Sequence, residues 1–359
     1  MTEILVDIRN HIGHISLNRP AALNALSFGM IEEMAARLHA WADDPQIHAV
    51  LVRGAGDKAF CAGGDVRALY DSFKAGLTAH QVFFAEEYKL DYHIHRYPKP
   101  YIALMDGIVM GGGMGISQGA VARIVTERTR LAMPEVGIGL FPDIGASYFL
   151  SRVPGALGLY LGLTGVQVRA ADVLYSGLAD WFVPVEGVPA LIDALHRLVW
   201  TGDHRADLHG VLRAFGKTSL PDPPLALLRP AIDLHFAKDS VPAIVASLQS
   251  ERRLEYAQWA RETLATIAKR SPTMMCVTYE QILRGRTMEL ADCFRMEIGM
   301  VHECFQQGDF VEGIRALIVD KDNEPRWNPP ALEAVQGETV ARFFAPHWAP
   351  GEHPLRELS

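Results

Sequence analysis

Cysteine is scarce in this sequence of 359 residues. The four cysteines stand at positions 61, 276, 293 and 304, and no two of them form a CxxC pair. This spacing argues against a structural zinc site. Few cysteines in a long chain are typical of a reducing compartment, so we expect a cytoplasmic protein.

Concentrated basic charge and long apolar runs are also missing. The formal net charge is −8, and Lys and Arg form no long cluster, which argues against a nucleic-acid-binding surface. No uncharged apolar run reaches roughly 18 residues, so no membrane span is expected. The N-terminus alternates polar and apolar residues and contains acids, so we expect neither a signal peptide nor a transit peptide.

The glycine-rich stretch "GGGMGISQG" lacks the two common phosphate-binding patterns, GxGxxG and GxxxxGK. Gly115 to Gly119 does match GxSxG, the serine-hydrolase elbow, but this short pattern is common by chance. An elbow serine must lie on the tight turn directly after a strand. Ser117 is expected inside the following helix, so a structural serine is the favoured interpretation and a serine hydrolase the weakest alternative.

The residues that are present predict an α/β fold. Hydrophobic residues make up 49% and charged residues 21%, as in an ordinary globular protein. The first half alternates strand and helix signals: a strand pair around 4–17 with a turn at Asn10 and His11, a helix over 27–42 capped by Ser27, and a helix over about 78–96. After about residue 190 helical periodicity dominates, and 217–230 is typical of a linker or an irregular crossing segment. We therefore expect a core over 1–200 and a mainly helical region over 201–359.

Two acids stand in the almost entirely apolar segment "MPEVGIGLFPDIGASYFL". Glu135 and Asp143 are eight residues apart, each beside a proline. Buried acids are costly unless they are paired or used. From the local sequence alone, a capping or salt-bridged role for Glu135 and a turn role for Asp143 are favoured.

Two glycine-rich loops precede expected helices. "CAGGD" holds Gly63 and Gly64, and the second loop holds the run 111–113. Backbone N–H groups at such places can stabilise an oxygen that becomes anionic. Either loop alone is explained as well by tight turns, but the two loops together with the acidic segment favour an oxyanion hole.

The stretches "LNRPAALNAL", "GAGDKAFCAGGDV", "KPYIALMDGIVMGGGMGIS" and "MPEVGIGLFPDIGASYFL" together resemble the crotonase (enoyl-CoA hydratase/isomerase) superfamily. Within it, "FFAEEYKL", "GLFPDIG", "SPTMM" and "DFVEGIRALIVDKDNEPRWNP" are similar to the subgroup that hydrolyses 3-hydroxyisobutyryl-CoA in valine breakdown. The resemblance implies a crotonase-like ββα spiral core with a helical C-terminal region. It covers nearly the whole chain.

The resemblance also implies site residues. The oxyanion amides fall on Gly64 and Gly112, and the catalytic acids on Glu135 and Asp143. The residues expected to bind substrate are Glu87, Ala62, Gly64, Asp65, Arg67 and Gly112. Hydratases of the family carry a second catalytic glutamate where this chain has Gly115, which disfavours a hydratase.

The implied reaction is hydrolysis of a 3-hydroxyacyl-CoA thioester. Glu135 either activates water or attacks the carbonyl, and Asp143 accepts a hydrogen bond from the substrate hydroxyl. CoA is part of the substrate, and no cofactor or metal is expected. A homo-oligomer is possible. The alternatives are a hydratase or isomerase acting on another acyl-CoA and a non-catalytic CoA-binding protein.

Overall fold

The computed structural model describes residues 2–216, 220–349 and 351–359. The chain forms two compact units, each made of three stretches of sequence. The first unit comprises 1–65, 89–131 and 167–224, and the second comprises 66–88, 132–166 and 225–359. The predicted division of the chain at residue 200 stays a prediction.

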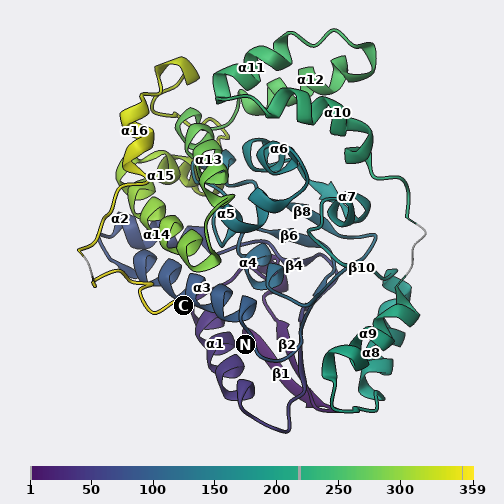
Figure 1. Ribbon diagram of the computed structural model, residues 1–359. Coiled ribbons are helices and arrows are strands. Elements are labelled where there is room, and N and C mark those ends of the chain that lie inside the picture. The colour runs from purple at the N-terminus through teal and green to yellow at the C-terminus, as the bar shows by residue number, and fades with distance from the viewer. Residues whose placement is uncertain (1, 217–219, 350) are drawn as a thin grey trace. The chain divides into compact units, whose positions relative to one another are not determined.

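The first unit contains two sheets, and several of their strands are labelled in Figure 1. The larger sheet has the order β1-β2-β3-β5-β7-β10, formed by Ile4–Arg9, Ile12–Leu17, Ala49–Gly54, Tyr101–Met105, Ala122–Val125 and Trp181–Phe182. The smaller sheet has the order β4-β6-β8-β9, formed by Ala59–Cys61, Ile108–Met110, Arg130–Ala132 and Val168–Arg169. No strand follows β10 among the residues that the structure describes, as the loss of strand signals after residue 190 predicts.

The predicted strand pair at the N-terminus is confirmed. Strands β1 and β2 pair antiparallel, with Ile4 opposite Leu17. The connecting residues Asn10 and His11 both have positive φ, 48° and 63°, which suits a tight hairpin turn. The other neighbours in the larger sheet pair in parallel, which requires the crossovers of an α/β fold.

The helix predicted over 27–42 is α1 (Phe28–Ala42). The Ser27 hydroxyl accepts a hydrogen bond from the Met30 N–H at 3.2 Å, so it caps the helix as predicted. The buried residues of α1 recur at helical spacing: Met30, Ile31, Met34, Leu38 and Trp41. This apolar stripe fixes which face of the helix turns inward.

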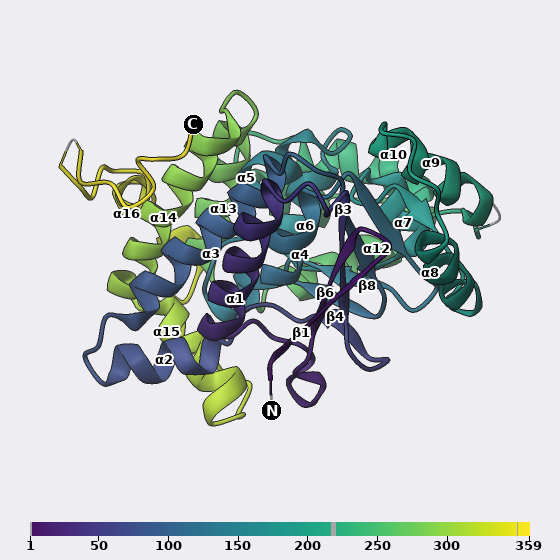
Figure 2. The same cartoon turned by 90° about the horizontal axis from the view of Figure 1, so that it is seen from below.

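The remaining helices of the first unit are α4 (Gly112–Gln118), α7 (Ala170–Tyr175), α8 (Val188–His196) and α9 (His204–Phe215). Helices α8 and α9 lie side by side (Figure 2), and their buried leucines join the core with side chains of the larger sheet. Helix α3 (Ala79–His95) confirms the helix predicted over 78–96 and crosses from the second unit into the first at residue 89.

The second unit is almost entirely helical in the described part of the chain. Its longer helices are α2, α6, α10, α11, α12, α13 and α14, formed by Val66–Lys74, Leu157–Thr164, Pro224–Phe236, Val241–Gln249, Leu254–Ile267, Pro272–Gly285 and Leu290–Gln307. Its short elements include η2 (Glu135–Ile138), α5 (Ala146–Phe149), α15 (Asp309–Ile314) and α16 (Gly337–Arg342). Helices α13 and α14 fall in the region after residue 190 for which helical periodicity predicts a mainly helical structure.

The predicted linker over 217–230 is wrong in its second half. Residues 217–219 lie outside the described part of the chain, and α10 begins at Pro224 and contains Pro230. A proline in the first turn loses no helical hydrogen bond. The interior Pro230 is tolerated because burial of residues such as Ile232 and Phe236 stabilises the helix.

Candidate active site

Glu135 lies on a short, sharply bent segment of the second unit. It begins η2 directly after Pro134, and its carbonyl accepts a hydrogen bond from the Leu140 N–H at 3.0 Å. Gly139 closes the turn with a φ of 75°, and a Cβ there would overlap the backbone carbonyl of Asp309 in α15. The turn therefore requires glycine, and it leaves Glu135 buried, with only 5% of its surface exposed.

Asp143 is buried in the same unit and is paired with a tyrosine. The hydroxyl of Tyr88 in α3 donates a hydrogen bond to Oδ2 of Asp143 at 2.8 Å. Burial raises the pKa of Asp143 to about 7, and the bond from Tyr88 works against this rise. Asp143 therefore changes its charge close to neutral pH.

Glu87 is the third buried acid of this group. It is buried, whereas its neighbour Glu86 is half-buried, so of the two glutamates it is Glu87 that turns inward. Burial raises the pKa of Glu87 well above its ordinary value, and the charge of Asp143 raises it further. Burial and Asp143 have the same effect on the pKa of Glu135. The structure therefore brings these three predicted site residues into one electrostatically coupled cluster.

Two carboxylate oxygens of this acidic cluster accept no hydrogen bond from the described residues. Oε1 of Glu87 and Oε2 of Glu135 are buried and meet no hydrogen-bond partner within the described part of the chain. Buried polar atoms are nearly always satisfied, so such exceptions call for an explanation. A substrate hydroxyl and a water molecule are donors of the right kind, and a carboxylate with a raised pKa is a competent general base.

The two predicted oxyanion amides lie in the first unit. Gly112 is the first residue of α4, after Gly111 with a φ of 46°, and Gly64 forms a bridge with Leu26. The glycine loops that hold them approach each other closely, because a Cβ on Gly63 would lie 3.8 Å from the nitrogen of Gly112. Neither the Gly64 N–H nor the Gly112 N–H donates a hydrogen bond among those found in the described residues.

The space beside Gly115 is filled by an acid from another helix. A Cβ on Gly115 would overlap the carboxylate of Asp91, a fully buried residue of α3. Both residues belong to the first unit. At the position where hydratases carry their second glutamate, a side chain in this chain would therefore require the Asp91 carboxylate to move.

Three further residues were expected to bind substrate. The Ala62 N–H donates to the Leu23 carbonyl at 3.1 Å. Asp65 accepts a hydrogen bond from Arg19 at 2.9 Å, so this arginine is engaged within the protein. Arg67 lies in the first turn of α2 in the second unit, is exposed and pairs with Asp71 one turn later. The binding role of all three stays a prediction.

Ser117 lies in α4, as predicted, and not on an elbow. It is fully buried, and its hydroxyl donates to the Gly113 carbonyl at 2.8 Å. Cys61, the other conceivable nucleophile, is buried in β4. The geometry of both residues is that of packing residues.

Sequence reasoning missed three residues around Asp143. Tyr88 belongs to the stretch "FFAEEYKL", whereas Gln281 and Glu297 lie far away in the sequence. Gln281 and Glu297 are fully buried on α13 and α14 among apolar neighbours. A polar residue on the apolar face of a predicted helix was the signal that could have identified them.

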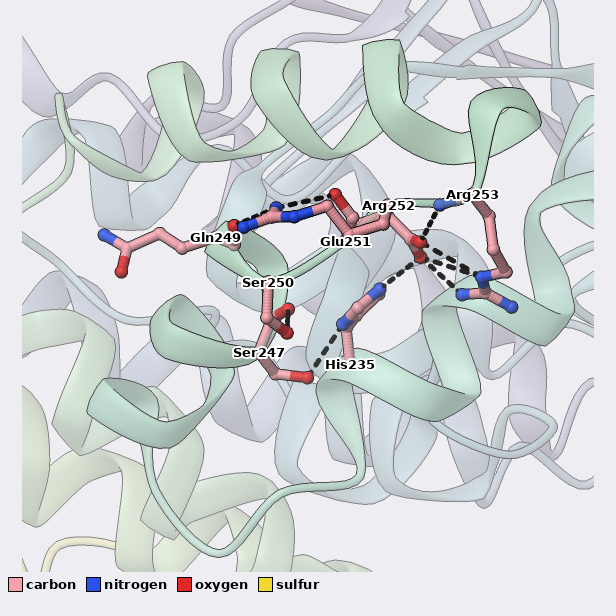
Figure 3. Close-up of polar contacts among 7 residues, drawn as sticks. All are labelled: His235, Ser247, Gln249, Ser250, Glu251, Arg252 and Arg253. Carbon is pink, nitrogen blue, oxygen red and sulfur yellow. Dashed lines mark hydrogen bonds and ion pairs between the residues drawn. The ribbon is translucent and has the colours of Figure 1, made fainter.

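Another polar cluster lies on α10 to α12 of the second unit (Figure 3). His235 Nδ1 lies 2.8 Å from the Ser247 hydroxyl, and its Nε2 lies 2.8 Å from Oε2 of Glu251. Arg253 also binds Glu251, through its side chain and its backbone N–H. The contacts of His235 and Glu251 tie α10, α11 and the start of α12 together.

Two findings concern other classes of function. Within the described residues, no group of three or more His, Cys, Asp and Glu side chains has the geometry to hold a metal ion. No helix in the same part of the chain combines the length and the apolar character that crossing a membrane demands.

The sequence is similar to one family model and to curated proteins over most of its length. The Enoyl-CoA hydratase/isomerase family model matches residues 12–344. The chain is 41% identical over 336 residues to the mitochondrial 3-hydroxyisobutyryl-CoA hydrolase of Xenopus tropicalis, covering 92% of this chain and 86% of that protein. It is 37% identical over 346 residues to the human protein of the same name, covering 95% and 88%.

Two solved structures resemble almost the whole chain. One is a carnitinyl-CoA dehydratase from Mycobacterium thermoresistibile, with a TM-score of 0.89 and 40% identity over 96% of this chain and 97% of that one. The other is an enoyl-CoA hydratase from Rhodobacter sphaeroides 2.4.1, with a TM-score of 0.87 and 37% identity over 96% and 98%. These similarities confirm the predicted α/β fold with a helical C-terminal region.

Proposed function

Because the chain belongs to the crotonase (enoyl-CoA hydratase/isomerase) family, we propose that it is an acyl-CoA thioester hydrolase whose substrate is 3-hydroxyisobutyryl-CoA. The products are 3-hydroxyisobutyrate and CoA, a step of valine breakdown. The sequence identity of about 40% to 3-hydroxyisobutyryl-CoA hydrolases over more than 90% of the chain supports this reaction. CoA is part of the substrate, and no further cofactor is proposed.

The observation that carries the proposal is the cluster of buried acids with open acceptor oxygens. Glu135 is the proposed essential carboxylate, either as general base toward water or as nucleophile. Glu87 and Asp143 are proposed to accept hydrogen bonds from the substrate, with Asp143 directed at the 3-hydroxyl. The amides of Gly64 and Gly112 are the proposed donors to the oxyanion, and losing one such donor typically costs about 3 kcal/mol of transition-state stabilisation.

A hydratase is the second candidate, because two closely similar solved structures are described as a dehydratase and a hydratase. Gly115 argues against it. Hydration of a double bond in this family uses two glutamates, and here the second position is a glycine whose Cβ space is occupied by Asp91. One experiment separates the two candidates: release of free thiol from 3-hydroxyisobutyryl-CoA, compared with the absorbance change of an enoyl-CoA. Thiol release supports the hydrolase, and an absorbance change without thiol release overturns it.

The role of Asp143 is tested by substrate selectivity. A hydrogen bond to a charged group contributes roughly 1.5–3 kcal/mol. Asp143→Asn should therefore reduce kcat/KM more for a 3-hydroxyacyl-CoA than for the same acyl-CoA without the hydroxyl. If both substrates lose activity in the same proportion, Asp143 acts in the chemistry or the fold and does not recognise the hydroxyl.

The cytoplasmic location and a homo-oligomeric state are also part of this proposal. The four free cysteines suit a reducing compartment, whereas the vertebrate relatives are named as mitochondrial. Fractionation of the cells that produce the protein would test its location, and analytical ultracentrifugation would test its assembly.

A further inference from the structure

The backbone that follows Asp143 makes a turn that only glycine accommodates easily. The Asp143 carbonyl accepts a hydrogen bond from the Ala146 N–H at 2.9 Å. Gly145 has a φ of 85°, and a Cβ at this residue would lie 3.0 Å from the ring of Phe294. A glycine turn is readily deformed, so the position of the Asp143 carboxylate depends on what holds the turn in place.

One glutamate, about 150 residues later in the sequence, binds the backbone of the turn that follows Asp143. Oε2 of Glu297 accepts a hydrogen bond from the Gly145 N–H at 2.7 Å, and Oε1 accepts one from the Ser147 N–H at 2.8 Å. Glu297 belongs to α14 and has no exposed surface. Both of its oxygens are therefore committed to the backbone on the C-terminal side of Asp143.

A glutamine on the neighbouring helix holds the other side of the same turn. Nε2 of Gln281 in α13 donates to the Pro142 carbonyl at 2.6 Å and to the Ser147 hydroxyl at 2.9 Å. Pro142 directly precedes Asp143 in the chain, so the two buried side chains together fix the backbone before and after the aspartate.

Burying Glu297 has a cost that a purely structural residue would avoid. Burial raises the pKa of Glu297 to about 8, and the hydrogen bonds from Ser147 and Gly145 work against this rise. Apolar residues often stabilise a protein core at least as well as buried charged groups. What an apolar residue cannot do is accept two backbone N–H groups and so set the geometry of the turn.

We propose that Glu297, assisted by Gln281, is a positioning residue that fixes the Asp143 carboxylate for recognition of the substrate hydroxyl. Glu297 acts through the backbone of residues 145–147 and does not itself touch the substrate. The inference rests on the proposed function for its meaning in catalysis, because the hydroxyl selectivity belongs to Asp143. A displacement of about 1 Å at such a site can reduce activity by about 100-fold.

The test is a double-mutant cycle in Glu297→Gln and Asp143→Asn. Glutamine keeps the shape of Glu297 but presents an NH2 group to one of the two backbone N–H groups, so one of the two bonds is lost. The measured quantity is the ratio of kcat/KM for the 3-hydroxyacyl-CoA to that for the acyl-CoA without the hydroxyl. Asp143→Asn should lower this ratio by about 10-fold to 100-fold, and Glu297→Gln should lower it by at least about fivefold.

Whether the effects of the two substitutions on this ratio are additive decides whether Glu297 acts through Asp143. In the Asp143→Asn background, Glu297→Gln should leave the ratio unchanged, because the residue that it positions is already lost. The matched control is Glu303→Gln, a buried glutamate on the same helix that pairs with Arg342, and it should leave the ratio at the wild-type value. An unchanged ratio in the Glu297→Gln single mutant, or effects that multiply in the double mutant, would overturn the proposal.

Two measurements keep the proposal testable in other circumstances. Where Glu297→Gln does not fold, Gln281→Met should lower the ratio in the same direction, and no change would refute the role of these two side chains. Where the wild-type enzyme releases no thiol, the proposed function fails, and amide hydrogen exchange then tests the contact of Glu297 with the turn by itself. Faster exchange of the Gly145 and Ser147 amides in Glu297→Gln but not in Glu303→Gln supports this contact, and unchanged exchange overturns it.

Discussion

Asp143→Asn should make the folded protein more stable at pH 8 while impairing its selectivity. Burial raises the pKa of Asp143 from 3.8 to about 7 in the folded protein, whereas the unfolded chain keeps the ordinary value. Between these two pH values the unfolded chain has released the proton that the folded protein still holds. The unfolded state is therefore increasingly favoured as pH rises through this range, and the loss is complete above pH 7. Asparagine cannot ionise and avoids this loss.

The magnitude follows from the size of the shift. A rise of about three pKa units at about 1.36 kcal/mol each gives an upper limit of about 4 kcal/mol. The Tyr88 hydroxyl loses a charged acceptor in the mutant, which removes about 1 kcal/mol or more. Removing the charge of Asp143 also relieves Glu87 and Glu135, whose pKa values it raises. We expect a net gain of about 1–3 kcal/mol in the free energy of unfolding at pH 8 and little or no gain at pH 5.

Urea unfolding of wild type and mutant at pH 5 and pH 8 measures this difference. Asp57→Asn, at an exposed aspartate, is the matched control and should have the same small effect at both pH values. If Asp143→Asn lowers the free energy of unfolding equally at pH 5 and pH 8, the carboxylate does not titrate near neutrality, and the account of the acidic cluster is wrong.

Three further predictions concern single residues. Glu135→Gln should lower kcat for thioester hydrolysis by at least about 100-fold, because it removes the proposed essential carboxylate; a folded mutant with wild-type kcat would refute that role. Ser117→Ala should retain kcat, since the hydroxyl bonds the Gly113 carbonyl, and abolished activity in a folded mutant would revive the serine-hydrolase alternative. Glu251→Gln should lower the free energy of unfolding in urea by about 1.5–3 kcal/mol, because it removes a charged acceptor shared by His235 and Arg253; Arg252→Gln, at an exposed neighbour, should not.

Local patterns in the sequence predicted the individual elements well. The apolar spacing in α1 and the capping Ser27 are properties of adjacent residues. The prediction of a linker over 217–230 was wrong in its second half because burial of apolar residues such as Leu225 and Ile232 stabilises α10 despite its prolines. Sheet order could not be predicted in this way, because the pairing of β10 with β7 depends on residues about 57 positions apart.

The residues of the candidate site show the same contrast between local patterns and contacts of distant residues. Glu135 and Asp143 are conspicuous because each is an acid in an apolar run, and Glu87 is identified by the family resemblance. Glu297 was missed because its bond to Ser147 spans 150 residues. No local pattern predicts which distant turn a buried glutamate will meet.

The contact between Gly115 and Asp91 bears on how hydrolases and hydratases of this family can diverge. A side chain added at position 115 alone would collide with the carboxylate of Asp91. Shortening Asp91 alone would open a hole in a fully buried region, and such cavities destabilise proteins. Each single change is therefore expected to cost stability. On a mutational path from this chain to a two-glutamate hydratase, the first substitution carries this cost in either order.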